Sequence, residues 1–160
     1  MRRNDKEITE INDKLAIIAK SKICRIGLSA NNFPYIVPLN YGYQYSNGVL
    51  TLFFHSAKEG KKIEIMRNND NVCFEIDCNT QLVEGIKACN YSYAFESIIG
   101  FGKIIFLETK DEKIQGLNFI MNHQTDKDKK YDFTEDEMKN ICVYKITVNE
   151  FTGKRKLLIK

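Results

Sequence analysis

Residues 24–54 read CRIGLSANNFPYIVPLNYGYQYSNGVLTLFF, and the class of fold follows from this part of the chain. Apolar and polar residues alternate over 24–29, and Asn31-Asn32 separates this run from a second one that begins at Tyr35. Alternation with a period of two is typical of a strand that buries one face. We therefore expect two strands joined by a tight turn.

Asn47-Gly48 is the strongest hairpin signal in the sequence, because a two-residue turn of this kind requires positive φ at both positions. It predicts a third strand over 49–54. The second strand is expected to continue past Pro38 toward Tyr45. Since proline has no N–H to donate to a ladder, this strand must lie at an edge or carry a bulge.

The rest of the chain shows the same short elements. Helices are expected over 7–20 and 58–67, around the apolar residues spaced over 114–121, and over 134–139. Strands are expected over 72–76, 89–93, 97–107 and 141–148, with a connecting loop over 78–88. About seven strands with three or four short helices favour an antiparallel barrel with peripheral helices over a parallel doubly wound sheet. No Pro/Gly-rich linker divides the sequence, so we expect one domain over 1–160.

Composition narrows the function. The net charge of +3 comes from evenly mixed charged residues, which argues against a nucleic-acid protein with a concentrated basic face. The polar start over 4–12 does not resemble a signal peptide, and the apolar run over 97–107 is too short to span a bilayer. Five cysteines without a C-x-x-C pair indicate reduced thiols and no metal role. A cytoplasmic location is expected.

The segment from Phe54 to Lys62 leaves a strand and enters a helix. Such a turn presents unpaired amide N–H groups at the positive end of the helix dipole, and here Ser56 adds a hydroxyl while Lys58, Lys61 and Lys62 add cations. The arrangement suits a phosphate group. It is not a Walker A loop, because it lacks the required glycine and hydroxyl residue. A solvated, lysine-rich helix start is the alternative interpretation.

Two further features leave their interpretation open. Gly100-Phe101-Gly102 resembles a dinucleotide fingerprint, but Ile105 occupies the position of the third glycine and the surroundings indicate strand. These glycines allow close approach of another backbone or a flat ligand, and a β-bulge explains them equally well. The strands are also rich in aromatic residues, which fits barrel and interface packing or a wall for a flat cofactor.

Several segments, taken in order, resemble the Nim-type nitroimidazole-resistance branch of the pyridoxamine-phosphate-oxidase-like flavoproteins. They are CRIGL over 24–28, PYIVPLNYG over 34–42, FHSA over 54–57 with Gly60 and Lys62, VCFE over 72–75, SIIGFG over 97–102 and TGKR over 152–155. The resemblance covers nearly the whole chain. It implies a mostly β, antiparallel, Greek-key-like FMN-binding split β-barrel that works as a homodimer, with two flavin sites between the subunits.

The resemblance also implies roles for individual residues. Lys62, Lys61 and Ser56 would hold the FMN phosphate. His55 would lie near the flavin or the substrate, and it is the candidate for substrate contact or proton supply. The strand formed by Val37, Pro38, Leu39 and Asn40 would run along the isoalloxazine edge and bond the pyrimidine side of the ring through main-chain groups.

A second set of residues would reach the cofactor from elsewhere. Ser92 and Ser97 would approach it across the dimer interface, and Lys154 or Arg155 would approach from the C-terminal end. The chain departs from the true pyridoxamine phosphate oxidases, since Tyr35 stands where they carry an arginine and no Trp is present. Oxidation of a vitamin B6 phosphate is therefore not expected.

The leading hypothesis is an FMN-dependent reductase. Reduced nicotinamide or another donor would deliver a hydride to the flavin, and a small organic acceptor, with nitroaromatics as one class, would receive the electrons. FMN is favoured over FAD because no segment remains for an adenine-binding half once one barrel is built. Two alternatives are a non-catalytic flavin carrier or sensor, and a haem-binding relative on the same barrel.

Overall fold

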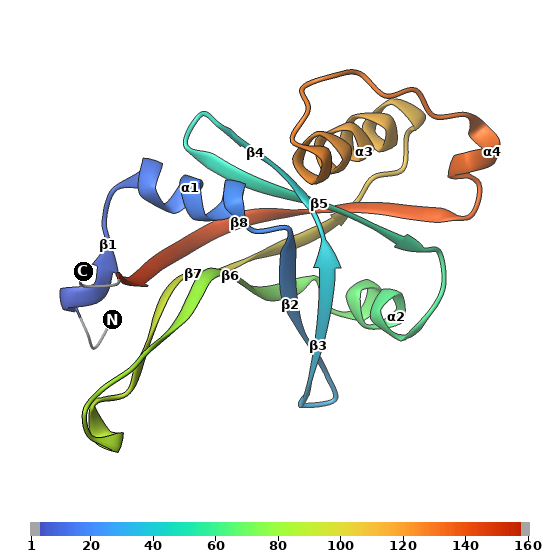
Figure 1. Cartoon of the computed structure of the whole chain (residues 1–160). Helices are drawn as coiled ribbons and strands as arrows, with labels where there is room; N and C mark the ends of the chain where they lie inside the picture. The colour runs from blue at the N-terminus through green and yellow to red at the C-terminus, as the bar shows by residue number, and fades with distance from the viewer. Residues whose placement is uncertain (1–3, 158–160) are drawn as a thin grey trace.

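A computed structural model describes residues 4–157 and shows one antiparallel sheet that curls into a barrel (Figure 1). The strands are β1 Glu7–Ile8, β2 Ile23–Ala30, β3 Phe33–Asn40, β4 Gly42–Ser46, β5 Val49–Ala57, β6 Asn71–Val83, β7 Ser92–Phe106 and β8 Ile141–Lys156. The helices are α1 Ile11–Lys20, α2 Lys61–Asn68, α3 Lys110–Thr125 and α4 Glu135–Met138, with short 3₁₀ turns at Asn4–Lys6 and Ala88–Asn90.

The strand order is β3-β2-β6-β7-β8-β5-β4, with β1 added to β8. The antiparallel barrel with peripheral helices expected from the sequence is thus confirmed. Alternate residues of the strands point inward and form the main core, to which Ile26, Phe74 and Ile146 contribute fully buried side chains. Helix α1 contacts β6 and β7, and the Tyr41 hydroxyl donates a hydrogen bond to the Ile18 carbonyl at 2.6 Å. This bond ties α1 to the barrel.

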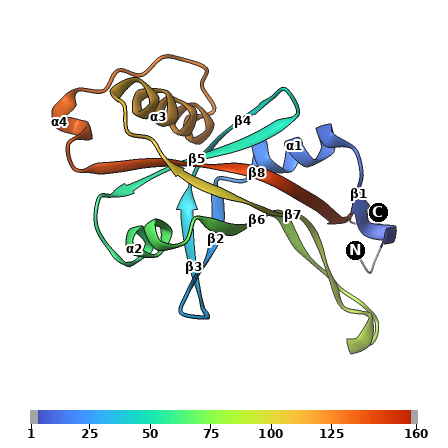
Figure 2. The same cartoon turned by 180° about the vertical axis from the view of Figure 1, so that it is seen from behind.

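A second, smaller core lies on the outer side of β5 and β8, under α3 and α4 (Figure 2). Phe53 of β5 and Val143 of β8 pack there against Leu117, and the Phe53 ring stacks on Phe119 with centroids 4.6 Å apart. A Cβ on Gly42 would come within 2.2 Å of the Phe119 backbone, so only glycine lets β4 approach α3 this closely. The aromatic strands therefore serve packing on both sides of β5.

Both tight turns are confirmed. Asn31 and Asn32 have φ of 51° and 65°, and Asn47 and Gly48 have φ of 52° and 79°. Strand β3 pairs with β2 alone among the described strands and ends the strand order, which explains why Pro38 is tolerated there.

Gly102 serves the packing of the sheet. The β7–β8 register shifts between Phe101 and Gly102, and a Cβ on Gly102 would lie 2.4 Å from the Thr147 carbonyl oxygen. A bulge and a close backbone approach, the two structural interpretations of this segment, thus occur together.

Several boundaries expected from the sequence are wrong, among them the end of the last strand, which runs from Ile141 to Lys156 rather than stopping at residue 148. The first helix begins at Ile11 instead of residue 7, because Glu7 and Ile8 pair with Lys154 and Gly153 of β8. The strand through Pro38 stops at Asn40, since the chain turns at Tyr41 to bury that ring in the core, and it resumes as β4.

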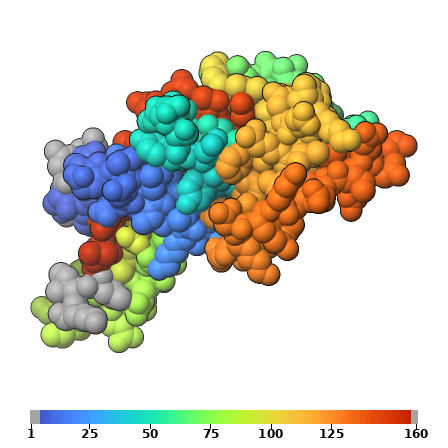
Figure 3. All heavy atoms as spheres, turned by 90° about the horizontal axis from the view of Figure 1, so that it is seen from above, coloured from blue at the N-terminus to red at the C-terminus, as the bar shows by residue number. Residues whose placement is uncertain are grey.

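A further error concerns residues 78–93. The predicted loop over 78–88 is part of β6 as far as Val83, and of the predicted strand over 89–93 only residues 92–93 belong to β7. The pair β6 and β7 extends beyond the barrel as an arm over 79–95, with residues 84–91 as its connection (Figures 1 and 3). A bulge between Cys78 and Gln81, with Asn79 at φ 56°, marks its base. Most arm side chains are exposed or half-buried, so no alternation of apolar and polar residues marks its strands in the sequence. The two strands expected over 89–107 are accordingly one.

Within residues 4–157, none of the helices combines the length and the apolar character needed to cross a membrane.

Candidate functional site

The corner between β5 and α2 has the features of an anion site. Gly60 sits before the helix at φ 124°, a conformation that side chains rarely adopt, and no side chain caps the helix. The amides of Ile63 and Glu64 donate to the Gly60 carbonyl at 2.9 and 3.2 Å. The amides of Lys61 and Lys62, one and two positions into the helix, have no partner within it. Two amides without a helical partner, and two lysine residues, therefore belong to the first turn at one positive helix end.

Strand β3 lies beside this corner although it is far from β5 in the strand order. The Lys61 ammonium lies 4.8 Å from the centroid of the Tyr35 ring, a cation–π contact that joins α2 to β3. A surface pocket lined by Ser29, Lys61 and Asn69 lies between α2 and the β2–β3 turn. The structure thus brings Lys61, one of the predicted phosphate-binding lysines, next to the strand predicted to follow the flavin.

The four predicted residues of β3 divide between its two faces. Val37 and Leu39 are half-buried and pack on the main core, whereas Pro38 and Asn40 are exposed. The Asn40 side chain donates to Lys22 O at 3.2 Å and Gln124 Oε1 at 3.1 Å, so it is occupied by protein groups. One edge of β3 carries no partner strand among residues 4–157, which leaves main-chain groups there open to a ligand.

His55 and Ser56 are consecutive residues of β5 and therefore point to opposite faces. His55 pairs with Val143 and shares the α3 side of the sheet, while Ser56 pairs with Cys142 and shares the barrel side. The Ser56 hydroxyl donates to the Ala57 carbonyl at 3.0 Å. Burial lowers the pKa of His55 from its ordinary value of 6.5, although the side chain reaches solvent.

The second predicted set, Ser92, Ser97 and Lys154, lies away from this corner. Ser97 and Lys154 are cross-strand partners, and the Lys154 ammonium lies 5.8 Å from the centroid of the Phe95 ring. Ser92 begins β7, and its hydroxyl accepts a hydrogen bond from Lys156. Figures 1 and 2 agree that the arm and α2 stand at different ends of the molecule. One chain therefore presents two separate groups of candidate residues.

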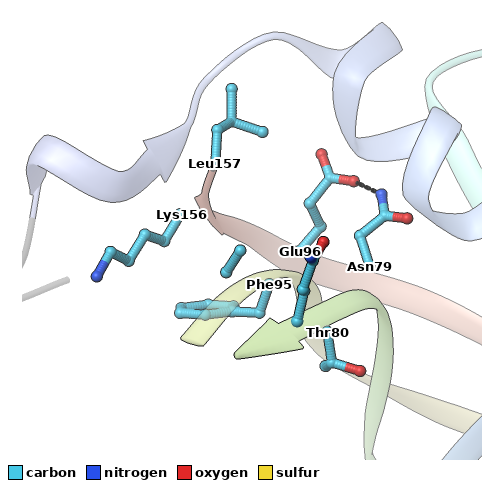
Figure 4. Close-up of a pocket in the computed structure, with 8 residues that line it drawn as sticks. Asn79, Thr80, Phe95, Glu96, Lys156 and Leu157 are labelled. Atoms are coloured by element: carbon cyan, nitrogen blue, oxygen red, sulfur yellow. Dashed lines mark hydrogen bonds between the residues drawn. The ribbon is translucent and has the colours of Figure 1, made fainter. Parts of the chain in front are cut away.

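A pocket lies beside this second group, between the arm and the end of β8 (Figure 4). Phe95 forms part of its wall, and Glu96 accepts a hydrogen bond from Asn79 across it. Arg155 bonds Asp13 of α1 at 2.7 Å and lies 3.8 Å from Glu96. Arg155 thus connects α1 to the base of the arm in this structure, and Lys156 lines the pocket.

His123, near the C-terminal end of α3, has both ring nitrogens engaged. Nδ1 lies 2.7 Å from the Tyr41 carbonyl oxygen and Nε2 lies 3.1 Å from the Ala19 carbonyl oxygen. The ring links α3 to α1 and to the β3–β4 junction. Among the described residues, no three His, Cys, Asp or Glu side chains gather as a set that could hold a metal ion.

The sequence predicted no binding role for two tyrosines, Tyr35 and Tyr144. Tyr35 contacts Lys61, a tertiary contact that no local pattern indicates. Tyr144 is fully buried inside the barrel, and its hydroxyl has no hydrogen-bond partner within the described part of the chain. The sequence signal for Tyr144 was its place between Cys142 and Ile146 on the inward side of a strand, where a polar atom needs a partner.

Comparison with known proteins identifies the family. The family model described as pyridoxamine 5'-phosphate oxidase matches residues 12–155. The chain belongs to the pyridoxamine 5'-phosphate oxidase family. This family consists of flavin-binding split-barrel proteins, and the match confirms the resemblance drawn from the sequence. No curated protein matches the chain at a significant level.

Solved structures agree with this family assignment. The chain is 33% identical to a Bacteroides thetaiotaomicron protein provisionally assigned to 5-nitroimidazole antibiotic resistance, with a TM-score of 0.79 over 92% of this chain and 85% of that one. The flavocytochrome Anf3 from Azotobacter vinelandii is 15% identical, with a TM-score of 0.80 over 99% and 72%. An FAD- and heme-binding protein from Mycobacterium smegmatis is 13% identical, with a TM-score of 0.79 over 94% and 73%. The last two show that the fold is shared.

The lowered pKa of His55 gives a testable pH dependence. Between this lowered pKa and about pH 6.5, the unfolded chain binds a proton at His55 that the folded chain does not. The free energy of unfolding should therefore fall as pH falls through this window, and His55→Gln should flatten that part of the profile. Denaturant unfolding across the window measures the slope. An NMR midpoint for the His55 ring at or above the ordinary value would contradict the assignment.

Proposed function

We propose that this family member binds FMN at the β5–α2 corner and acts as an FMN-dependent reductase for a small organic acceptor. The observation that carries the proposal is the uncapped start of α2, with Lys61 and Lys62 in its first turn and the Lys61 ammonium against Tyr35 of β3. A phosphate dianion matches this set of donors, and charge-assisted hydrogen bonds to it are stronger than neutral ones. FMN, with a single terminal phosphate, is the flavin that this corner fits best.

The residues of the chain support binding and orientation of the flavin. Ser56 and the two lysines would hold the phosphate, and the open edge of β3 over 37–40 would supply main-chain hydrogen bonds to the ring. Bound FMN would supply the hydride chemistry, which leaves the protein to place the reactants and exclude water. Because burial favours the neutral form of His55, its ring can accept or donate a hydrogen bond near an acceptor at neutral pH.

The observed role of Tyr35 argues against a vitamin B6 phosphate as substrate. Its ring receives the Lys61 ammonium, and it offers no guanidinium for a second phosphate group. A neutral or nitroaromatic acceptor does not need that partner. The likeness to the 5-nitroimidazole resistance protein supports nitroaromatic compounds as the first acceptors to try.

We also propose that the active form is a homodimer. The outer face of β3, β2, β6 and β7 carries a row formed by Ile36, Gly27, Cys73 and Phe101, which are paired across the four strands. Ile36 is 68% exposed and Phe101 51% exposed, an apolar surface of the kind that marks a protein contact. Ser97 and Lys154 belong to this same outer face, so a second chain there would bring them to a neighbouring corner.

Flavin affinity tests the corner. Lys62→Ala should weaken FMN binding about 10- to 100-fold, the range expected for loss of a charged hydrogen bond, while riboflavin binding stays unchanged because riboflavin has no phosphate. Quenching of flavin fluorescence measures both affinities. Lys139→Ala, at an exposed position after α4, is the control. Equal losses for both flavins would show that the lysine does not hold the phosphate.

Reduction of the bound flavin tests the activity. Under anaerobic conditions, NADH or NADPH should bleach the flavin absorbance of the loaded protein, and a nitroaromatic acceptor should restore it. His55→Gln should leave FMN affinity unchanged and slow the restoring step about 100-fold or more, if His55 supplies the proton. A stable flavin spectrum with either nucleotide would favour a carrier or sensor, and a Soret band after haem addition to colourless protein would favour a haem protein.

Light scattering after gel filtration tests the dimer. Phe101→Glu places a charge in the apolar row and should convert the protein to a monomer with weakened FMN binding. Val49 on the β4–β5 hairpin is 43% exposed, and the Val49→Glu variant should remain dimeric. A monomeric wild type, or a Phe101→Glu variant of unchanged mass, would refute the proposed interface.

A further inference from the structure

The Tyr144 hydroxyl is a buried polar group that the fold itself does not satisfy. Tyr144 is 0% exposed, and its hydroxyl finds no hydrogen-bond partner in the part of the chain that the structure describes. Its ring stacks on Phe54 with centroids 5.6 Å apart and contacts Phe106 at 6.0 Å. A phenylalanine would make the same ring contacts without burying an unpaired hydroxyl, which is costly. The hydroxyl therefore calls for a function outside packing.

The strand register places this hydroxyl near the anion corner. Phe54 of β5 lies opposite Tyr144 of β8, and Ser56 lies opposite Cys142. Ser56 and Tyr144 are therefore diagonal neighbours on the barrel face, within reach of an aromatic side chain. Burial raises the pKa of Tyr144, and the nearby Ser56 side chain opposes this rise, although the two hydroxyls do not meet the geometry of a hydrogen bond in this structure. Tyr144 thus stays a protonated phenol that can donate to Ser56.

Ser56 has the capacity to use such a donor. A serine hydroxyl has one proton and two acceptor lone pairs, and its proton goes to the Ala57 carbonyl at 3.0 Å. Turning this proton toward a ligand at the corner would break that local bond. A donor on the other side of Oγ would favour the turned orientation, because each hydrogen bond polarises the next.

We propose that Tyr144 is a positioning residue for anion binding, whose hydroxyl donates to Ser56 Oγ and orients the Ser56 proton toward a phosphate group at the start of α2. This inference rests on the proposed function, in which the phosphate belongs to FMN. The chain Tyr144–Ser56–phosphate forms when the ligand is bound. In the free protein the unpaired tyrosine hydroxyl lowers the stability of the fold.

The inference gives Tyr144→Phe two effects of opposite sign. Removal of an unsatisfied hydroxyl should leave the melting temperature of the FMN-free protein unchanged or higher. FMN affinity should fall about 3- to 10-fold, the size expected for one neutral hydrogen bond, with riboflavin affinity unchanged. If Tyr144 had a packing role alone, Tyr144→Phe would keep its ring contacts and would not separate the two flavins.

The experiment is a double-mutant cycle on the full chain, read by flavin fluorescence for FMN and riboflavin. Tyr144→Phe should cost nothing further in a Ser56→Ala background, because the hydroxyl then has no Oγ to orient. Tyr41→Phe is the matched control, since the Tyr41 hydroxyl is equally buried but already bonds the Ile18 carbonyl. It should lower the melting temperature and leave the preference for FMN over riboflavin intact.

The outcomes separate this inference from the proposed function. Wild-type protein that does not bind FMN, or binds it no better than riboflavin, overturns both. Wild-type protein that prefers FMN, with a Tyr144→Phe variant of unchanged preference, overturns the role of Tyr144 alone. Additive losses in the double variant, or a lower melting temperature of FMN-free Tyr144→Phe, also overturn it.

Discussion

Strand β8 pairs with β7 along one edge and with β5 and β1 along the other, and the candidate site depends on this double pairing. Because β5 leads into α2, the β5–β8 register sets the position of the helix start that carries Lys61 and Lys62. The same register brings Tyr144 diagonal to Ser56. Along its other edge, β8 holds Lys154 opposite Ser97. One sixteen-residue strand therefore fixes both groups of candidate residues.

Because side chains alternate across each strand, neighbouring residues face different surroundings and can have different roles. Ser56 points into the barrel beside Tyr144, whereas His55 points to the α3 side with Phe53 and Val143. A sequence shows two adjacent polar residues as one motif, but a strand sends them to different surroundings. In our proposal the phosphate and the acceptor are handled on different faces of β5, so changes at His55 and Ser56 should be separable.

Local patterns were sufficient for the hairpins and for most of the strands. Asn31-Asn32 and Asn47-Gly48 adopt the positive φ that their residue types favour, and Gly102 sits where only a residue without Cβ can approach the next strand. The patterns failed to predict where β3 ends, because burial of the Tyr41 ring in the core turns the chain there. They also failed on the arm, where side chains are exposed and no alternation of apolar and polar residues marks the strands. The strand-to-helix turn over 54–62 indicated the lysine corner, and the resemblance to a family assigned it to a flavin phosphate. The contact of Lys61 with Tyr35 and the burial of the Tyr144 hydroxyl could be found only from the tertiary structure, because the residues around each are distant in sequence.

The arm over 79–95 has a consequence for dynamics. Leu82, Tyr93 and the fully exposed Ile86 meet solvent rather than a core, so few buried contacts oppose its separation from the barrel. Segments of this kind open with a small free energy, far below that of global unfolding. Its amide hydrogens should exchange with deuterium much faster than those of β5 or β8, and any molecule that packs on the arm should slow that exchange without altering the barrel.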